Sequence, residues 1–369
     1  MPASQDTLFQ FFSYCQDRGL PVAFYRLPQL KEVKVVVQKQ GAARPFRFGK
    51  ASLKASGFVF CPFNEEGNYK NVIIRSDIFC SEKTLPALTF AAKSVRVKLK
   101  KEGKLKESNR KQYEGLVRKM KKAIKAGRFE KIIAARVLKH KKPQHFDAVM
   151  LFRSLCAKYP AAFVSLVYTP QYGLWIGASP EILLEVNKGS FKTYALAGTK
   201  ANTPKNLKAG WGEKEKAEHK FVSNYIAKVF SAVTKQKPVI KAMETINAGN
   251  LLHLRTTFLY KKMAPALWQK AVSALHPTPA VAGLPTKEAV QFIGKHELNP
   301  RAFYSGYLGP VNLDNSINLY VNLRCMQVLK HKLAIYVGCG ITADSNPAAE
   351  WHESKIKTET LLNALEKSA

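Results

Sequence analysis

The stretch that decides the fold is "AAFVSLVYTPQYGLWIGASPEILLEVNKGSFKTYALAG", residues 161–198, in which apolar runs of strand length follow one another closely. The tetrapeptides "PQYG" (170–173) and "NKGS" (187–190) are typical of hairpin turns, which proline, glycine and asparagine favour. Spacings this short, with such turns between the runs, indicate strands that follow one another as an antiparallel meander.

The rest of the chain mixes strands and helices without strict alternation. Strand-like runs include "KIIAARVL" (131–138) and "KLAIYVGCGI" (332–341), and helical patterns cover about 110–126, 213–235 and 347–367. A doubly wound parallel fold would alternate strand and helix regularly. The pattern therefore predicts an α+β fold with large antiparallel sheets.

Composition places the chain among globular proteins. Its 369 residues are 46% hydrophobic and 23% charged, and the longest apolar runs fall far short of the roughly 20 residues that a membrane span needs. The first residues lack the basic region and cleavage pattern of a signal peptide. We expect a cytoplasmic protein with no membrane partner and six reduced cysteines.

The charge is strongly positive, with 59 Lys and Arg against 26 Asp and Glu and a net charge of +33. Such a charge attracts anions, whether nucleic acid, a membrane surface or a small acidic metabolite. Basic residues are densest over 93–142, but aromatic side chains that would stack on bases are almost absent there. We interpret this segment as a helix with a solvated lysine face and expect no nucleic-acid partner; a nucleic-acid patch is the alternative.

The few acids fall in a distinctive pattern near the C-terminus. In "GCGITADSNPAAEWHESKIK" (338–357), Glu350, Glu353 and Lys357 share one helical face. By themselves, Glu353 and Lys357 could form an ordinary surface ion pair.

A second segment, "GEKEKAEHKFVSNYI" (212–226), places Glu215 and Glu218 on one helical face. Two helices with such pairs supply four carboxylates, and ligation by oxygen alone suits Mg²⁺. No His/Cys cluster competes for a softer metal.

Two ionisable residues stand in apolar surroundings. Lys131 begins "KIIAARVL", and a lysine buried there loses proton affinity and can act as a base. Glu181 follows a Ser-Pro bend in "GASPEILLEV", where burial would raise its pKa and let it act as an acid. The alternatives are a lysine that extends to solvent and a glutamate at an exposed strand end.

Other polar residues stand out more weakly. Arg324 lies alone in the apolar run "VNLRCMQV", where its planar guanidinium needs a partner such as a substrate carboxylate. Gly198 and Thr199 in "YALAGTK" offer backbone amides and a hydroxyl. His276 lies in the proline-rich "HPTPAVAGLP", and Tyr304 precedes two glycines in "RAFYSGYLGPV".

Taken together, these stretches resemble the chorismate-utilising enzymes, which include isochorismate, salicylate, anthranilate and aminodeoxychorismate synthases. The resemblance covers about 110–365 and rests on "GASPE", "LAGT", "HPTPAV" and "EWHESKIK" in this order. It implies a single α+β domain whose two large antiparallel sheets form a sandwich with helices outside. Residues 1–110 would be a variable N-terminal part and 111–369 the catalytic part.

Two positions indicate the reaction type by this resemblance. Lys131 stands where anthranilate synthases carry glutamine, and Ala197 where aminodeoxychorismate synthases carry a nucleophilic lysine. Both imply attack by water. The expected activity is isochorismate synthase, an isomerase of menaquinone or siderophore biosynthesis; the alternative is salicylate synthase, which also eliminates pyruvate.

The resemblance also implies roles in the site. Lys131 would take a proton from water attacking C2 of chorismate, while Glu181 protonates the departing C4 hydroxyl. Glu218 and Glu353 would bind Mg²⁺ directly, and Glu215 and Glu350 would hold its waters. The residues expected to hold the enolpyruvyl carboxylate are Tyr304, Arg324, the backbone of Gly338 and Lys357; those expected to line the ring pocket are Gly198, Thr199, His253 and His276.

Three mild departures from the family pattern, Lys200, Ser354 and Ala302, bear on how the substrate is held rather than on the reaction. We expect a monomer that acts on chorismate.

Overall fold

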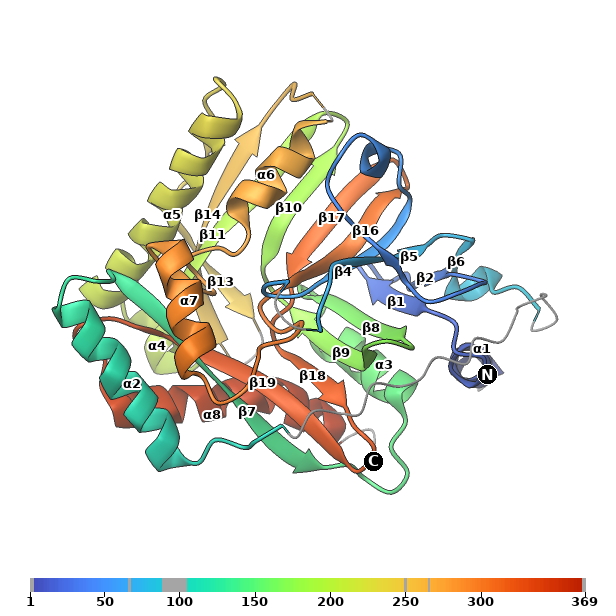
Figure 1. Cartoon of the computed structure of the whole chain (residues 1–369), viewed down its shortest axis with the longest axis horizontal. Helices are drawn as coiled ribbons and strands as arrows, with labels where there is room; N and C mark the ends of the chain where they lie inside the picture. Colours follow the sequence, from blue (N-terminus) through green and yellow to red (C-terminus); the bar gives the residue numbers. More distant parts are fainter. Residues whose placement is uncertain (1–2, 66–67, 88–104, 249–250, 265, 367–369) are drawn as a thin grey trace.

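The computed structural model describes residues 3–65, 68–87, 105–248, 251–264 and 266–366. Its strands form two antiparallel sheets that face each other (Figure 1). Sheet A has the order β15 (Gly283–Leu284), β7 (Lys131–Lys141), β19 (Lys332–Ile341), β18 (Cys325–Val328), β9 (Gly173–Ser179), β8 (Phe163–Thr169), β1 (Val22–Arg26), β2 (Lys34–Val37) and β6 (Ile78–Ser81). Sheet B has the order β12 (Val239–Ile240), β14 (Leu251–Tyr260), β11 (Ser190–Ala201), β10 (Ile182–Asn187), β17 (Ser316–Val321), β16 (Tyr307–Leu313), β4 (Gly57–Cys61), β5 (Val72–Arg75) and β3 (Arg44–Pro45), with β13 (Glu244–Ala248) also paired to β14. The predicted α+β fold with large antiparallel sheets is confirmed.

The predicted meander over 161–198 is wrong in one respect. The two hairpins are present, but β8–β9 belongs to sheet A and β10–β11 to sheet B. The chain changes sheets at Pro180, which has no N–H to continue a ladder. On the far side, the backbone N–H of Val321 donates to the carbonyl of Glu181, at 3.0 Å, so the crossing is tied to sheet B.

Alternation along the strands separates an inner core from an outer one. In β1, Ala23 and Tyr25 belong to the core between the sheets, whereas Val22 and Phe24 pack in the core outside sheet A. The inner core is largely aromatic: the rings of Phe163 and Tyr320 stack across the two sheets at 4.1 Å. Apolar packing in this inner core joins the two sheets.

Helices cover the outer faces (Figure 1). The outer core of sheet A includes α1 (Ala3–Asp17), α3 (Ala148–Lys158) and α8 (Pro347–Leu365). That of sheet B includes α5 (Glu213–Val233) and α6 (Leu267–Leu275). A further cluster packs α2 (Arg110–Lys125) and α7 (Thr286–His296) against β7 and β19, and the short α4 (Pro204–Lys208) precedes α5.

A buried ion pair fixes the loops around the end of β7. The guanidinium of Arg301 lies 2.6 Å from the carboxylate of Glu297, and both side chains are almost inaccessible to solvent. Arg301 also donates to the carbonyls of Ile133 and Val281, and Glu297 accepts from the backbone N–H of Ala135. This pair therefore joins β7 to the segment that precedes β15.

Replacing Arg301 by methionine should lower the free energy of unfolding by about 3 kcal/mol, because it leaves the Glu297 carboxylate buried without its cation. The matched control is Arg110→Met, whose ion pair with Glu114 is exposed and should contribute less than about 1 kcal/mol. Urea unfolding of the three proteins measures both effects. Equal losses for the two variants would contradict the structural role of Arg301.

Candidate active site

A cavity of about 70 Å³ lies between the sheets, lined by residues of β7 and β19 from sheet A and of β11 and β14 from sheet B. Its lining includes Lys131, Glu181, Glu218 and every predicted substrate residue except His276. These residues come from positions far apart in the sequence. The structure therefore brings the predicted catalytic pair and most of the predicted substrate contacts into one site.

Two glycines of β19 make room for this site. A Cβ atom on Gly340 would lie 2.7 Å from Oε1 of Glu218 and 2.9 Å from Cε of Lys131. A Cβ on Gly338 would lie 2.8 Å from the hydroxyl oxygen of Tyr304. Both contacts are too short for any side chain, so only glycine permits the observed approach at these positions.

Lys131 is buried rather than extended to solvent, with 1% of its surface exposed. Its Nζ donates to Oε1 of Glu218, a residue of α5, at a distance of 2.7 Å. Burying an ammonium is costly unless it is paired, so the contact with Glu218 accounts for a lysine in this apolar strand. The predicted base and one predicted metal ligand thus contact each other directly.

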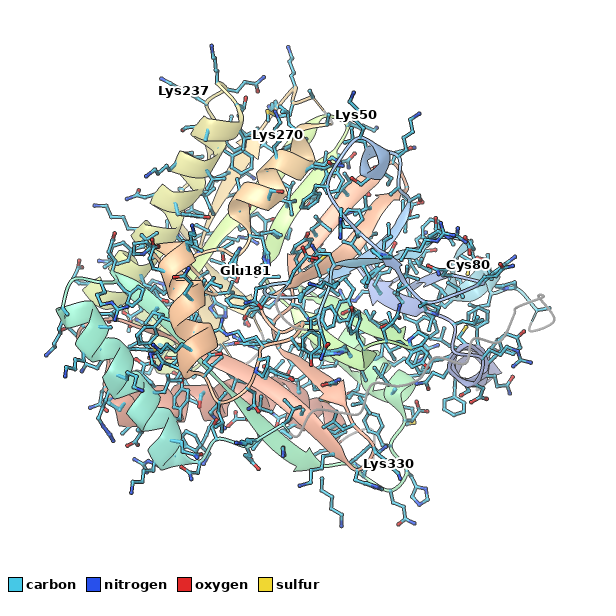
Figure 2. All side chains as sticks on the ribbon, in the orientation of Figure 1. Lys50, Cys80, Glu181, Lys237, Lys270 and Lys330 are labelled. Carbon is cyan, nitrogen blue, oxygen red and sulfur yellow. The ribbon has the colours of Figure 1, made fainter. Side chains whose placement is uncertain are left out.

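Glu181 lies near the middle of the molecule (Figure 2) and is 5% exposed, so the alternative of an exposed strand end is wrong. Burial raises the pKa of its carboxyl to about 7, although the charges of Lys131 and Arg324 act in the opposite direction. The group is therefore able to hold a proton near neutral pH, as a general acid must.

Three groups form a cationic and hydroxylic wall of the cavity. Arg324 has a positive φ of 48°, and no hydrogen bond of its guanidinium is present among the described residues. Burial raises the pKa of Tyr304 to about 12, so the phenol keeps its proton. Lys357 donates to the carbonyl of Gly338 at 3.0 Å and pairs with Glu353 at 2.6 Å. Burial disfavours the charged form of Lys357, but the nearby Glu353 carboxylate outweighs this effect. The pKa of Lys357 is therefore raised well above its ordinary value.

A β-bulge shapes the opposite wall. The register of β11 against β14 shifts between Ala197 and Thr199, and Gly198 at the bulge has a φ of +79°. Nδ1 of His253 lies 3.2 Å from both the Thr199 hydroxyl and the Gly198 carbonyl. Burial, together with the charges of Arg324 and Lys357, lowers the pKa of His253 to about 3, so its ring is neutral.

His276 was predicted to line the ring pocket, but it is not among the residues that line this cavity. Its Nε2 lies 3.1 Å from the carbonyl of Phe63, and its ring packs edge-on against Tyr307 at 4.8 Å. His276 is the C-cap of α6, and Ala280 and Val281 of the loop that follows line the cavity.

Sequence reasoning missed Ser305, which lines the cavity and is completely buried. Its Oγ has no hydrogen-bond partner among the described residues, so it is available to a bound molecule. A serine before a glycine carries no signal of this kind in sequence, although its position beside Tyr304 placed it in a segment already singled out.

Three of the four predicted metal residues, Glu218, Glu350 and Glu353, lie beside residues of β19. Oxygens of Glu350 and Glu353 and the Sγ of Cys339 all lie within 4.8 Å of one another. Glu218 lies against Gly340, as described above, and Glu215 turns toward Gly212, the N-cap of α5, since a Cβ on Gly212 would lie 2.7 Å from its Oε2. Carboxylate oxygens are the donors that Mg²⁺ prefers, so the residues present fit this ion, with a thiol beside them.

A family model described as chorismate binding enzyme matches residues 70–366, which is most of the chain. The chain belongs to this family. The predicted resemblance is therefore confirmed.

Two curated proteins and one solved structure are among those similar to this chain. Isochorismate synthase EntC of Escherichia coli strain K12 is 28% identical over 241 residues, covering 63% of this chain and 62% of that protein. The salicylate biosynthesis isochorismate synthase of Pseudomonas aeruginosa is 27% identical over 284 residues, covering 72% and 56%. The solved structure of MenF, the menaquinone-specific isochorismate synthase from Escherichia coli, matches with a TM-score of 0.77 at 21% identity, covering 99% of this chain and 91% of that one.

The matched segments span less than two thirds of the length of both curated relatives.

Among the described residues, no helix combines the length and the apolar character needed to cross a lipid bilayer.

Replacing Glu181 by glutamine should remove a loss of stability at high pH. The folded protein binds the Glu181 proton more tightly than the unfolded chain, because burial raises the pKa from 4.5 to about 7. Its contribution to the free energy of unfolding is thus complete below about pH 4.5 and is lost as the pH rises through about 7, by on the order of 3 kcal/mol.

Urea unfolding at about pH 5 and about pH 8 tests this prediction. At the higher pH, the free energy of unfolding of the variant should have risen relative to that of the parent protein by that amount. Glu130→Gln, at an exposed position, is the matched control, and its free energy of unfolding should show no such rise. Parallel pH dependences of the parent and the Glu181→Gln variant would show that Glu181 titrates normally.

Proposed function

We propose that the protein is an isochorismate synthase, which adds water at C2 of chorismate and expels the C4 hydroxyl. The observation that carries this proposal is the presence of a buried amine, Lys131, and a buried acid with a raised pKa, Glu181, in the lining of one small cavity. Ala197 lines the same cavity and offers no competing nucleophile. Family membership and the names of the similar proteins support the choice of chorismate.

The two catalytic groups would act on opposite sides of the substrate ring. Nζ of Lys131 accepts a proton as the oxygen of water bonds to C2. The ring double bonds shift, the C4–O bond breaks, and Glu181 gives its proton to the departing hydroxyl. One water is consumed and one is released, so the reaction is an isomerisation and needs no oxidant. A carboxyl with a pKa of about 7 suits this role, because it is protonated near neutral pH and releases the proton readily.

The other cavity residues would bind and orient the substrate. Arg324 and Lys357 supply positive charge to a carboxylate, and the protonated hydroxyl of Tyr304 supplies a hydrogen bond. The neutral ring of His253, fixed beside Thr199 and Gly198, adds a polar contact without another charge. These cations balance the two negative charges of chorismate.

Mg²⁺ would be held by Glu218 and Glu353, with Glu215 and Glu350 on its water ligands. When bound, the ion offsets the charge of the ring carboxylate and anchors it. The product would feed menaquinone or siderophore biosynthesis, as the names of relatives suggest.

Lys131→Ala and Glu181→Gln should each reduce kcat by about 10²-fold or more, because each removes one proton-transfer group. Chromatography of a reaction containing chorismate and Mg²⁺ measures isochorismate, and circular dichroism checks the fold. Lys141→Ala, at the exposed end of the same strand, is the matched control and should retain full activity. Chorismate left unreacted by the parent protein would refute the function, and salicylate as the product would identify a salicylate synthase instead.

Glu353→Ala should abolish Mg²⁺ binding as well as turnover, because it removes one of the two carboxylates expected to bind the ion. Isothermal titration of the protein with MgCl₂ measures binding without reference to activity. Glu359→Ala on the exposed side of the same helix is the control and should bind Mg²⁺ like the parent. Unchanged Mg²⁺ affinity in the Glu353 variant would remove this residue from the metal site.

A further inference from the structure

Cys339 occupies an unusual place in β19. Its neighbours Gly338 and Gly340 face the cavity, and alternation along the strand turns Cys339 to the other face of sheet A, where it packs with residues of α2 and α8. The side chain is 1% exposed. Its Sγ is a hydrogen-bond donor to the backbone carbonyl of Glu350, at 3.5 Å.

Two carboxylates reach the same thiol. One oxygen each of Glu350 and Glu353 and the Sγ of Cys339 lie within 4.8 Å of one another. In the part of the chain that the structure describes, this is the one group of three His, Cys, Asp or Glu side chains that converges in this way. The donors around a tetrahedral Zn²⁺ lie roughly 3.3–3.8 Å apart, given metal–ligand bonds of about 2.0–2.3 Å. Small side-chain movements would therefore close the site.

We propose that Cys339 makes this centre a binding site for thiophilic divalent cations such as Zn²⁺ and Co²⁺, held by the Cys339 sulfur and the carboxylates of Glu350 and Glu353. The metal–sulfur bond forms as the thiol proton passes to solvent, and no electron is transferred. The inference rests on the proposed function in one respect: Glu350 and Glu353 are also expected to serve Mg²⁺.

The mixed donor set separates the metals by chemistry. Mg²⁺ takes oxygen ligands and gains nothing from a thiol, whereas Zn²⁺ and Co²⁺ bind thiolate sulfur well. An ion bound through Cys339 occupies two of the carboxylates that the Mg²⁺ site needs. Zn²⁺ therefore acts as an inhibitor that competes with Mg²⁺.

The test follows absorption in the near ultraviolet during titration of the metal-free, reduced protein with Co²⁺, because sulfur ligation produces a sulfur-to-cobalt charge-transfer band. The band should rise to saturation at one equivalent in the parent protein and be absent from Cys339→Ala and from Cys339→Ser. The matched control is Cys325→Ala, since Cys325 is equally buried on the neighbouring strand β18 but belongs to no such group among the described residues. This variant should keep the band.

Binding measurements complete the test. Zn²⁺ affinity should fall by about 10- to 100-fold in both Cys339 variants, while Mg²⁺ affinity stays within about twofold of the parent. The serine variant keeps the experiment decisive if the alanine variant does not fold. No band in the parent protein at saturating Co²⁺, or a band that survives in either Cys339 variant, would overturn the proposal. Because these readouts do not involve chorismate, their failure is distinct from the failure of the proposed activity.

Discussion

Lys131, which is buried, and Glu218, which is partly exposed, form an ion pair in the lining of the cavity, with the two charged atoms 2.7 Å apart. Burying the Lys131 ammonium alone would cost several kcal/mol, and it is tolerated because Glu218 supplies an anionic partner. The pair also joins the layers: Lys131 belongs to β7 of sheet A, and Glu218 to α5, which packs on sheet B. Their approach depends on Gly340, where any side chain would occupy the same space. The lining of the cavity therefore holds a charged pair that joins the two layers.

The distribution of charge follows from the same constraint. Lysine side chains project from the periphery of the molecule, among them Lys50, Lys237, Lys270 and Lys330, whereas Glu181 lies in its middle (Figure 2). Solvated lysines cost little wherever they stand, so the surface tolerates a large positive excess. An acid inside needs either a cationic partner, as Glu218 has, or a proton, as the raised pKa of Glu181 supplies. A buried acid is therefore restricted to positions that supply a cation or a proton, whereas an acid on the surface has no such restriction.

Local sequence signals foresaw the hairpins, the polar residues in apolar runs and the start of α8 at Asn346, whose side chain accepts from two backbone N–H groups. They did not foresee the change of sheet at Pro180 or the bulge at Gly198, because both depend on which strand lies opposite. The pairing of Lys131 with Glu218 joins residues 87 positions apart, and no local pattern encodes it. Among the predicted cavity residues, His253 and the backbone of Gly338 were named only because the motifs resembled a family. His276 shows the limit of that route, since a motif fixes a residue's place in the chain but not its contacts, which here are the Phe63 carbonyl and the Tyr307 ring.

Two ion pairs connect the predicted substrate and metal residues. Lys131 pairs with Glu218, and Lys357 pairs with Glu353, so each predicted direct metal ligand contacts a lysine of the cavity. A ligand that draws Glu218 away leaves the buried amine of Lys131 without its anion. A ligand that draws Glu353 away leaves Lys357 as a charged donor beside Gly338, at the cavity wall. The proposed Mg²⁺ and dianionic substrate, arriving together, would exchange partners with these two pairs and leave the total buried charge unchanged.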